Sequence, residues 1–486
     1  MKHNNSPNDN PKKPIKKVKF EDNIFQIGYG SVGQCILPLV LKHVDIDPKK
    51  ITVMDAHNNK DIFDKNNYHC QYVRHRVTKS NMEKTLQKYL RKGDMLINVS
   101  TDIAGIEITK WCQVNGVLYI DTSIENWPTE FQTSATPALG RTLYNSHQAI
   151  RKKLKVGSPH TTAIVTHGAN PGLVSHFTKA ALLDIARHLK KNRETPETKE
   201  QWADLAANLK VKVIHISERD TQISSKPKEK DEFVNTWSVE GFWAEGIAPA
   251  EMGWGTHEKE LPPSGGEHAE GPKNAIYINR PGCNTYVRSW VPLGGDIHGF
   301  CIQHSEAVTI SDYLTQWKNG KAVYRPTVHY AYHPCDAAIV SMHELRMKQY
   351  AYPEVQRIMN DDIISGIDEL GVLLMGHDAN AWWYGSQLGI EETRQIMGKG
   401  HNPTTLQVAA ALIGGIVWMI KNPEEGYLEP DDLPFAEILE IANLYLGPIA
   451  SVQSDWNPLK ERSDLFPTDM DKEDLWQFKN FLVKGA

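Results

Sequence analysis

The sequence has 486 residues, of which 40% are hydrophobic and 23% are charged, and its formal net charge is −5 at pH 7. This length predicts two or three domains with a large core, and the composition is typical of a soluble globular protein. The weakly negative charge argues against a general nucleic-acid-binding protein. The six cysteines are widely spaced without a C-x-x-C pair, which fits a reducing cytoplasm and argues against a disulfide framework or a zinc ribbon.

The chain start carries no charged-then-apolar leader, so we expect a cytoplasmic protein without a secretion signal. Residues 1–20 are polar, basic and proline-bearing, which predicts a flexible tail. The longest apolar run, Val408 to Ile420, is shorter than the ~20 residues that a bilayer span needs. We therefore expect no membrane insertion.

A glycine pattern typical of dinucleotide-binding folds follows the tail. Gly28, Gly30 and Gly33 form G-x-G-x-x-G between a predicted strand and a predicted helix at Cys35 to His43. The first glycine allows a tight turn, the second lets the backbone approach a pyrophosphate, and the third lets helix and strand pack closely. Ser31 and Val32 lie inside the pattern, where a helix N-terminus offers free N–H groups to phosphates. We predict all five residues to bind the cofactor.

An acidic residue stands where such folds bind a ribose. Asp55 ends the predicted strand Ile51–Met54, 22 residues after Gly33, close to the usual spacing of ~20. Its carboxylate would accept hydrogen bonds from a ribose diol and repel a 2′-phosphate. Because residues 57–60 contain no arginine, we predict NAD rather than NADP; the alternative is an ordinary surface loop.

Short apolar strands alternate with helical segments from Phe25 to about residue 165, which indicates a parallel sheet. The predicted fold class is α/β: a Rossmann-type doubly wound parallel sheet plus a second α+β substrate-binding and dimerisation domain. The expected strands are Phe25–Ile27, Ile51–Met54, Met95–Val99, Leu118–Ile120 and Ala163–Thr166. The expected domains are the tail 1–20, an NAD-binding domain 21–166 completed by about 385–440, a substrate domain 167–384 and a closing helical segment 441–486.

Polar side chains follow several of these strands at the carboxyl edge, where doubly wound sheets bind ligands. Asp102 and Glu125 are therefore expected beside the nicotinamide, with helix N-capping as the alternative role. Asn170 lies in the loop His167–Gly172, before a helix predicted at Leu173 to Leu189. It could orient a substrate amine or the nicotinamide amide, although a simple turn role before a proline is also compatible with its position.

The next strand is predicted over residues 211–217. Neither of its faces is purely apolar, which favours a half-buried or edge position. Glu218 directly follows this strand and is a candidate site residue; alternatively, it forms an ion pair with Arg219 or another surface cation.

Residues 233–306 place aromatics and carboxylates among glycines, including Trp237, Glu245, His304 and Glu306. A tryptophan face attracts a cation and a carboxylate neutralises it, so this composition predicts a pocket for an ammonium ligand. The alternative is that the tryptophans are core residues and the acids are solvated.

Two later segments carry structural predictions. Tyr324 to Asp336 holds two histidines and a cysteine but no second ligand pair, which favours a structural strand over a metal site. Thr404 to Ile420 is a strongly apolar helix, which we expect to pack on the first sheet.

A dinucleotide fold with an acidic, aromatic pocket suggests a dehydrogenase acting on an amine. The ammonium must lose a proton before hydride can leave the neighbouring carbon, so a base is required. Glu218, His304 or Glu245 could serve.

The chain closely resembles the bacterial homospermidine synthases, which are related to the saccharopine and carboxynorspermidine dehydrogenases. The resemblance runs from about Phe25 to about residue 470. Its motifs are IGYGSVGQ at 27–34, HGANPG at 167–172, NTWSVEGFWAEG at 235–246, EMGWGTHE at 251–258, HSEA at 304–307 and DELGVLLMGH at 368–377.

This resemblance implies that two putrescine molecules give homospermidine and ammonia through imines, with NAD as a recycled hydride carrier, and it suggests a homodimer. Trp237 would guide cationic substrates by cation–π contact, while Glu245 and Glu125 would fix amino groups. The implied lining of the reacting centre is Asn170, Glu218, His304 and Glu306, with Asp102 and Asp368 completing the acidic pocket. Asp102 and Asn170 are also expected to contact the cofactor.

Two alternatives stay open. An NAD(P)-dependent reductive aminase of the carboxynorspermidine or saccharopine type would act on carboxylated substrates and need a basic pocket residue, for which Arg288 is the main candidate. A non-catalytic NAD-sensing protein on the same fold would not need so many acids in loops.

Overall fold

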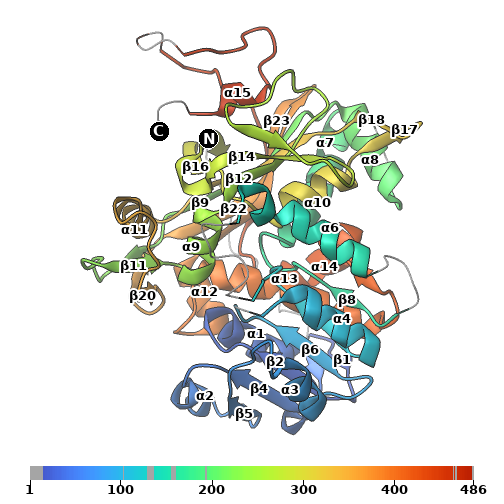
Figure 1. Ribbon diagram of the computed structural model, residues 1–486, viewed down its shortest axis with the longest axis vertical. Helices are drawn as coiled ribbons and strands as arrows, with labels where there is room; N and C mark the ends of the chain where they lie inside the picture. Colours follow the sequence, from blue (N-terminus) through green and yellow to red (C-terminus); the bar gives the residue numbers. More distant parts are fainter. Residues whose placement is uncertain are drawn as a thin grey trace.

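The computed structural model describes residues 15–101, 103–127, 136–154, 160–191, 194–463, 465 and 468–483. Asp102, one of the predicted site residues, lies outside them. Two sheets occupy the lower and upper halves of the molecule in Figure 1, with helices α13 (Pro403–Lys421) and α14 (Phe435–Ala442) between them.

The first sheet is the predicted doubly wound one. Its seven strands are all parallel, in the order β24-β8-β7-β6-β2-β4-β5. Their bounds are β2 Ile24–Ile27, β4 Ile51–Asp55, β5 Gln71–Arg74, β6 Met95–Asn98, β7 Leu118–Asp121, β8 Ala163–Ile164 and β24 Tyr427–Leu428. The central strands are buried on both faces, as their continuous apolar runs require.

Helices cover both faces of this sheet: α1 lies on one face with α13, and α3 and α4 lie on the other. Their bounds, with the neighbouring helices, are α1 Ser31–His43, α2 Lys60–Asn66, α3 Met82–Tyr89, α4 Gly105–Asn115 and α6 Leu143–Lys153. The predicted strands are confirmed, but β8 ends two residues early. Thr166 has φ +55° and donates its N–H to Asp121 Oδ1 at 2.6 Å, so the chain turns there.

The second sheet has ten strands in the order β13-β14-β12-β19-β9-β22-β23-β25, with β15 and β16 alongside. Most of its pairs are antiparallel, although β19 and β9 run parallel. The bounds are β9 Val213–Asp220, β12 Pro249–Gly253, β13 Gly265–Glu267, β14 Ala275–Pro281, β15 Tyr286–Val291, β16 Gly295–Phe300, β19 Thr327–His333, β22 Ile367–His377, β23 Asn380–Gly389 and β25 Ile449–Ser454.

The predicted edge or half-buried position of the strand at 211–217 was wrong. This strand, β9, is central and buried, between β19 and β22. Its polar side chains have buried partners: His215 Nδ1 lies 2.9 Å from Ser289 Oγ, and Ser217 donates to Trp290 O at 2.8 Å. Such partners remove the penalty of burying polar groups, and they come from segments that the local pattern does not reveal.

Helix α13, Pro403–Lys421, fills the space between the sheets. It contacts α1 and β7 on one side and β22 and β23 on the other, which confirms the predicted packing on the first sheet. A Cβ on Gly415 would lie 2.9 Å from Ile120 Cδ1, so this helix approaches β7 closely. The helix is longer than the apolar run and could cross a membrane by length and composition, yet 83% of its apolar window is buried inside the protein.

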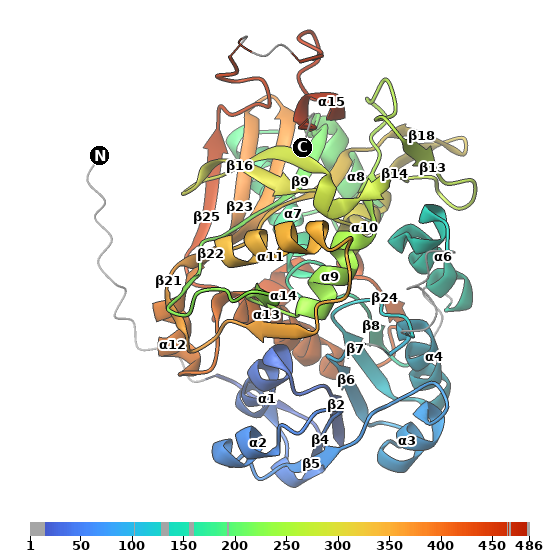
Figure 2. The same cartoon turned by 60° about the vertical axis from the view of Figure 1, so that its left-hand side comes forward.

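The closing helical segment predicted at 441–486 was also wrong. Helix α14, Phe435–Ala442, ends as that segment begins, and β25 then pairs with β23 of the second sheet (Figure 2). Within the part of this segment that the structure describes, only α15, Phe478–Phe481, is an α-helix. The polar alternation of Ile449–Ser454 suits an edge strand with one face on the sheet.

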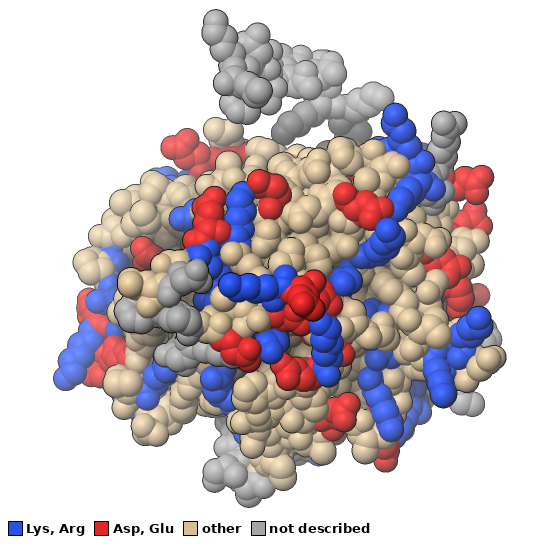
Figure 3. All heavy atoms as spheres, turned by 90° about the horizontal axis from the view of Figure 1, so that it is seen from above, with Lys and Arg blue, Asp and Glu red and all other residues tan. Residues whose placement is uncertain are grey.

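The remaining elements lie outside the two large sheets. The helices are α7 Leu173–His188, α8 Lys199–Leu209, α9 Val239–Ile247, α10 Ser305–Tyr313, α11 Asp336–Met347 and α12 Ile390–Met397, and the 3₁₀ helices are η1 Pro48–Lys50, η2 Ala138–Arg141, η3 Gly282–Asn284 and η4 Pro430–Asp432. The strands are β1 Val18–Lys19, β3 Val44–Asp45, β10 Ile223–Ser224, β11 Glu232–Asn235, β17 Gln316–Lys318, β18 Lys321–Tyr324, β20 Val355–Ile358 and β21 Ile363–Ser365. On the face drawn in Figure 3, acidic and basic side chains are interspersed.

Candidate active site

The glycine loop has the geometry that a dinucleotide pyrophosphate needs. Gly28 has φ +100°, and a Cβ there would lie 2.6 Å from Val99 O. A Cβ on Gly33 would lie 2.3 Å from Gly28 O, whereas one on Gly30 would meet nothing within 4 Å. Packing therefore requires the outer two glycines, and the middle one faces open space where a phosphate can approach.

The first turn of α1 contains no acidic residue and no side-chain cap. The helix begins at Ser31, earlier than the predicted Cys35, so Ser31 and Val32 are its first residues. Their N–H groups are free to bind phosphate, as the pattern predicted.

Asp55 is held in place at the end of β4. Its Oδ2 accepts the Tyr29 N–H at 2.5 Å, and its Oδ1 accepts the His57 N–H at 2.7 Å. Each oxygen keeps a second lone pair, so the carboxylate can still bind a ribose diol. Residues 57–60 contain no arginine, but the sheet places one on the neighbouring strand, because Arg74 on β5 is the register partner of Asp55.

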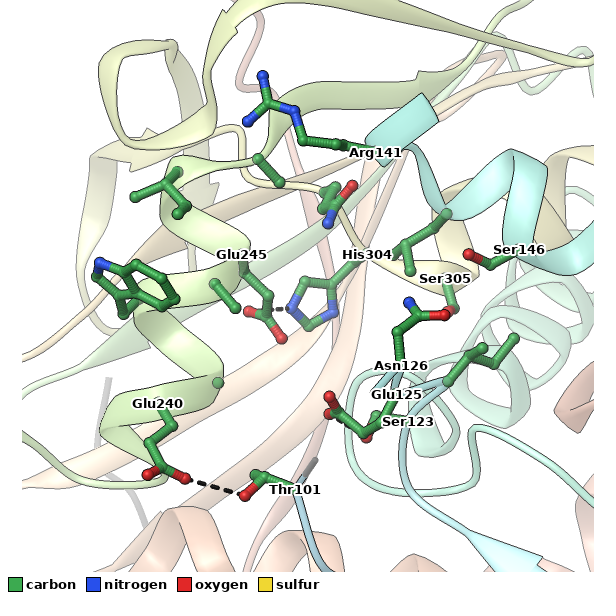
Figure 4. A pocket seen from close by; sticks show the side chains of 18 of the residues that line it. Thr101, Ser123, Glu125, Asn126, Arg141, Ser146, Glu240, Glu245, His304 and Ser305 are labelled. Atoms are coloured by element: carbon green, nitrogen blue, oxygen red, sulfur yellow. Dashed lines mark hydrogen bonds and ion pairs between the residues drawn. The ribbon is translucent and has the colours of Figure 1, made fainter. Parts of the chain in front are cut away.

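A cavity of about 350 Å³ opens beside the carboxyl edge of the first sheet (Figure 4). The first half contributes the loops after β6 and β7, with Thr101 and Glu125, and the second half contributes α9 and the start of α10. Ser123 donates to Glu125 Oε1 at 2.8 Å. Glu240 on α9 accepts bonds from Thr101 at 2.9 Å and Tyr352 at 2.8 Å, which ties the two halves together.

His304 stands in the cavity wall between two carboxylates. Its Nε2 lies 3.1 Å from Glu245 Oε2, and its Nδ1 lies 3.2 Å from Glu306 Oε1. Burial alone would lower the pKa of His304, but the two carboxylates outweigh it and raise the pKa well above its usual value. The two carboxylates thus favour the imidazolium form of the ring, which suits His304 to act as a proton donor.

A second cluster joins the predicted residues Asn170 and Glu218. Asn170 Nδ2 donates to Glu218 Oε2 at 2.7 Å, and the hydroxyl of Tyr330 on β19 donates to the same oxygen. The Tyr330 ring lies 4.3 Å from the His304 ring, centroid to centroid. Burial raises the pKa of Glu218 to about 7, against the opposing effect of its two donors. A carboxylate with this pKa is suited to accept a proton near neutral pH.

Two further carboxyls extend this cluster inward. Asp368 on β22 is the register partner of Asp220 on β9, and Asp220 lies on the same strand face as Glu218. Burial raises the pKa of Asp220 to about 6, and burial with both neighbouring acids raises the pKa of Asp368 well above its usual value. Asp368 Oδ2 accepts from Thr404 at 2.5 Å, but its buried Oδ1 has no hydrogen-bond partner.

Trp237 stands near this acidic cluster. Its indole N–H donates to Tyr332 at 3.0 Å, and burial together with Glu218, Asp220 and Asp368 raises the pKa of the Tyr332 phenol well above its usual value. In the described part of the chain, no lysine or arginine forms an ion pair with Glu218, Asp220 or Asp368. The cluster thus gathers three carboxyls near an aromatic ring, and a bound ammonium would favour their ionised forms.

The sequence did not identify Tyr330 and Asp220 as members of the candidate site, and it placed the wrong arginine, Arg288, in the pocket. Asp220 was detectable, since it lies two residues after Glu218 and thus on the same face. Tyr330 was hidden in the segment 324–336, which is the predicted strand but also part of the site. Arg288 was wrong as the pocket cation: it lies on β15, donates to Leu482 O at 3.1 Å and does not line the cavity. The arginine that does is Arg141.

Comparisons with known proteins agree with this architecture. Residues 24–164 match the family model described as the saccharopine dehydrogenase NADP binding domain, and residues 168–452 match the saccharopine dehydrogenase C-terminal domain. The homospermidine synthase of Blastochloris viridis is 43% identical over 471 residues, covering 96% of this chain and 98% of that protein. The chain belongs to the homospermidine synthase family.

Other members of the homospermidine synthase family cover the chain equally well. The homospermidine synthase of Mesorhizobium japonicum is 41% identical, with coverage of 95% of this chain and 96% of that protein. A crystal structure of the Legionella pneumophila homospermidine synthase in complex with NAD has a TM-score of 0.89 and 40% identity, and covers 97% of this chain and 100% of that one. The similarity therefore spans the glycine loop, the cavity and the acidic cluster together.

Proposed function

We propose that this protein is an NAD-dependent homospermidine synthase that converts two putrescine molecules into homospermidine and ammonia. The observation that carries the proposal is the buried cluster Glu218, Asp220 and Asp368, which lies near Trp237 and forms no ion pair with a lysine or arginine among the described residues. Relatives named homospermidine synthase, one of them solved with NAD, support it.

Putrescine is a dication, and the site offers charges of the opposite sign at two depths. One ammonium would bind at the inner cluster, where a cation recovers the cost of burying several carboxyls together. The other would reach Glu245 and Glu125 on the cavity wall. Trp237 would hold the passing cation on its ring face. The two anchors fix the reacting carbon at one depth, which is the geometric requirement for hydride transfer.

The coenzyme residues fit NAD: the open face of Gly30 would admit the pyrophosphate, and the Asp55 carboxylate would bind the ribose diol. NAD held by these residues would supply hydride transfer at the amine carbon and at the new imine. We assign to Glu218 the removal of a proton from the substrate ammonium, and to Asn170 the orientation of the reacting nitrogen. The second putrescine amine adds to the imine carbon. We assign to His304 the proton that the departing ammonia requires.

Product analysis tests the proposal. Purified protein mixed with labelled putrescine and substoichiometric NAD should form many equivalents of labelled homospermidine per NAD, without any carboxylated amine. Absence of homospermidine would overturn the assignment. Product that appears only with a carboxylated partner would favour the reductive aminase, and NAD binding without turnover would favour the sensor.

We further propose, from the family resemblance, a cytoplasmic homodimer. Light scattering behind size-exclusion chromatography should give twice the mass of one chain, and a monomeric mass under assay conditions would refute the dimer.

A further inference from the structure

One side chain in the cavity wall has the wrong charge for a diamine. Arg141 lines the cavity, and its buried Nε has no hydrogen-bond partner. Among the described residues, no carboxylate forms an ion pair with it. In Figure 4, Arg141 lies at the opposite side of Glu245 and His304 from Glu125, Glu240 and Thr101. The cavity therefore has an acidic region and, across from it, a guanidinium whose buried Nε–H lacks an acceptor among the described residues.

Several hydrogen bonds fix the backbone around Arg141. Arg141 ends the 3₁₀ helix η2, and Thr142 and Asn145 both donate to Leu139 O, at 2.9 and 2.6 Å. Helix α6 begins directly afterwards, and its first N–H groups are held by a residue from the second sheet. Glu251 on β12 accepts the N–H of Leu143 at 2.8 Å and that of Tyr144 at 2.9 Å.

Glu251 is fully buried and its two carboxylate oxygens take one N–H each. Burial raises the pKa of Glu251 to about 7, against the effect of these two bonds. The fork also compensates the positive end of the α6 dipole. Glu251 lies in the EMGWGTHE motif, and this contact anchors the segment that carries Arg141 from the opposite half of the molecule.

A buried guanidinium N–H without an acceptor is costly, and its best acceptor is a planar carboxylate, which it binds with parallel, charge-assisted hydrogen bonds. We infer that the cavity accepts, as the second amine, an α,ω-diamino acid whose carboxylate binds Arg141. L-Ornithine, which is putrescine with a carboxylate on one terminal carbon, has the required groups. Its ω-ammonium would occupy the acidic region while its carboxylate lies on the opposite side.

This inference rests on the proposed function, because the imine comes from putrescine. The ω-amine of ornithine, as the free base, forms a C–N bond to the imine carbon. The C–N bond to the original nitrogen then breaks and ammonia leaves with a proton from the protein. The hydride that putrescine gave up returns to the new imine carbon. The product is a 4-aminobutyl ornithine, and the reaction has no net redox change.

A competition assay tests the inference. The parent protein, with NAD, labelled putrescine and unlabelled L-ornithine, should form both homospermidine and the carboxylated product, distinguished by mass. Arg141→Gln should lower the ratio of carboxylated product to homospermidine by about tenfold or more. Arg141→Lys should recover part of the ratio, because it keeps the charge but loses the fork. Lys110→Gln, at an exposed residue on α4, is the matched single-charge control and should leave the ratio unchanged.

The outcomes separate this inference from the proposed function. Homospermidine without any carboxylated product in the parent would overturn the inference alone, while the absence of both products would overturn the proposed function. A parallel fall of both products in Arg141→Gln, with the ratio unchanged, would show that Arg141 only supports the fold and would overturn its role as the carboxylate site.

Discussion

Replacing Tyr330 by phenylalanine removes one hydroxyl from the buried cluster around Glu218. This hydroxyl donates to Glu218 Oε2, which also accepts Asn170 Nδ2 at 2.7 Å. A hydrogen bond to a charged group contributes about 1.5–3 kcal/mol, and about 1.4 kcal/mol changes an ionisation equilibrium tenfold. The donor stabilises the ionised carboxylate, so its loss should raise the pKa of Glu218 above its present value of about 7.

The expected result is a displaced pH–rate profile. If Glu218 must be ionised to accept the substrate proton, the acidic limb of kcat/KM should move up by about one to two pH units in Tyr330→Phe, with most of the activity regained in alkaline buffer. Tyr332→Phe is the matched control, because Tyr332 accepts a hydrogen bond from Trp237, whereas the described donors to Glu218 are Asn170 and Tyr330. An acidic limb at the same pH in Tyr330→Phe and the parent would refute the assignment of Glu218 as the base.

Three further predictions follow from the structure. Gly33→Ala should lower the free energy of unfolding by about 1–3 kcal/mol, because the new Cβ would lie 2.3 Å from Gly28 O. Gly30→Ala should keep the parent Tm but weaken NAD binding. Melting curves and calorimetric titration check the two variants, and equal losses of Tm would contradict the distinction between the two glycines. The raised pKa of Glu218 means that the folded protein binds more protons than the unfolded chain between its ordinary value of 4.5 and about 7, so this group's stabilising effect falls as pH rises through that window. Putrescine should therefore raise Tm more at about pH 8 than at about pH 5, and a larger effect in acid would contradict the acidic cluster as its site. Glu245→Gln and Trp237→Ala should each reduce turnover at least about tenfold with the far-UV spectrum unchanged, and near-parental rates in both variants would count against the pocket.

Local sequence patterns were sufficient to predict the strands of the first sheet. The strands of a doubly wound sheet are buried on both faces, so each appears as an apolar run followed by a turn, and glycines with special backbone needs stand at fixed spacing. The same logic placed α13 against the first sheet, since a helix apolar on most of its surface has to be buried. Local patterns gave the wrong position for β9 in its sheet, and they predicted helix where β25 is a strand. The buried partners of β9 lie on β15, and β25 is paired with β23, which precedes it by many residues.

The sequence by itself determined the glycine loop and the acidic residue at the end of β4, and it predicted an acidic, aromatic pocket, because these depend on residue type and short spacing. Only the tertiary structure shows which acid is suited to act as a base and which histidine is suited to act as a proton donor, because a pKa depends on burial and on charges from distant segments. Glu218 receives its donors from Asn170 and Tyr330, and His304 its two carboxylates from α9 and α10. The same contacts replaced Arg288 by Arg141 as the cation of the cavity, since only the packing of η2 and α6 on Glu251 brings that side chain to the wall.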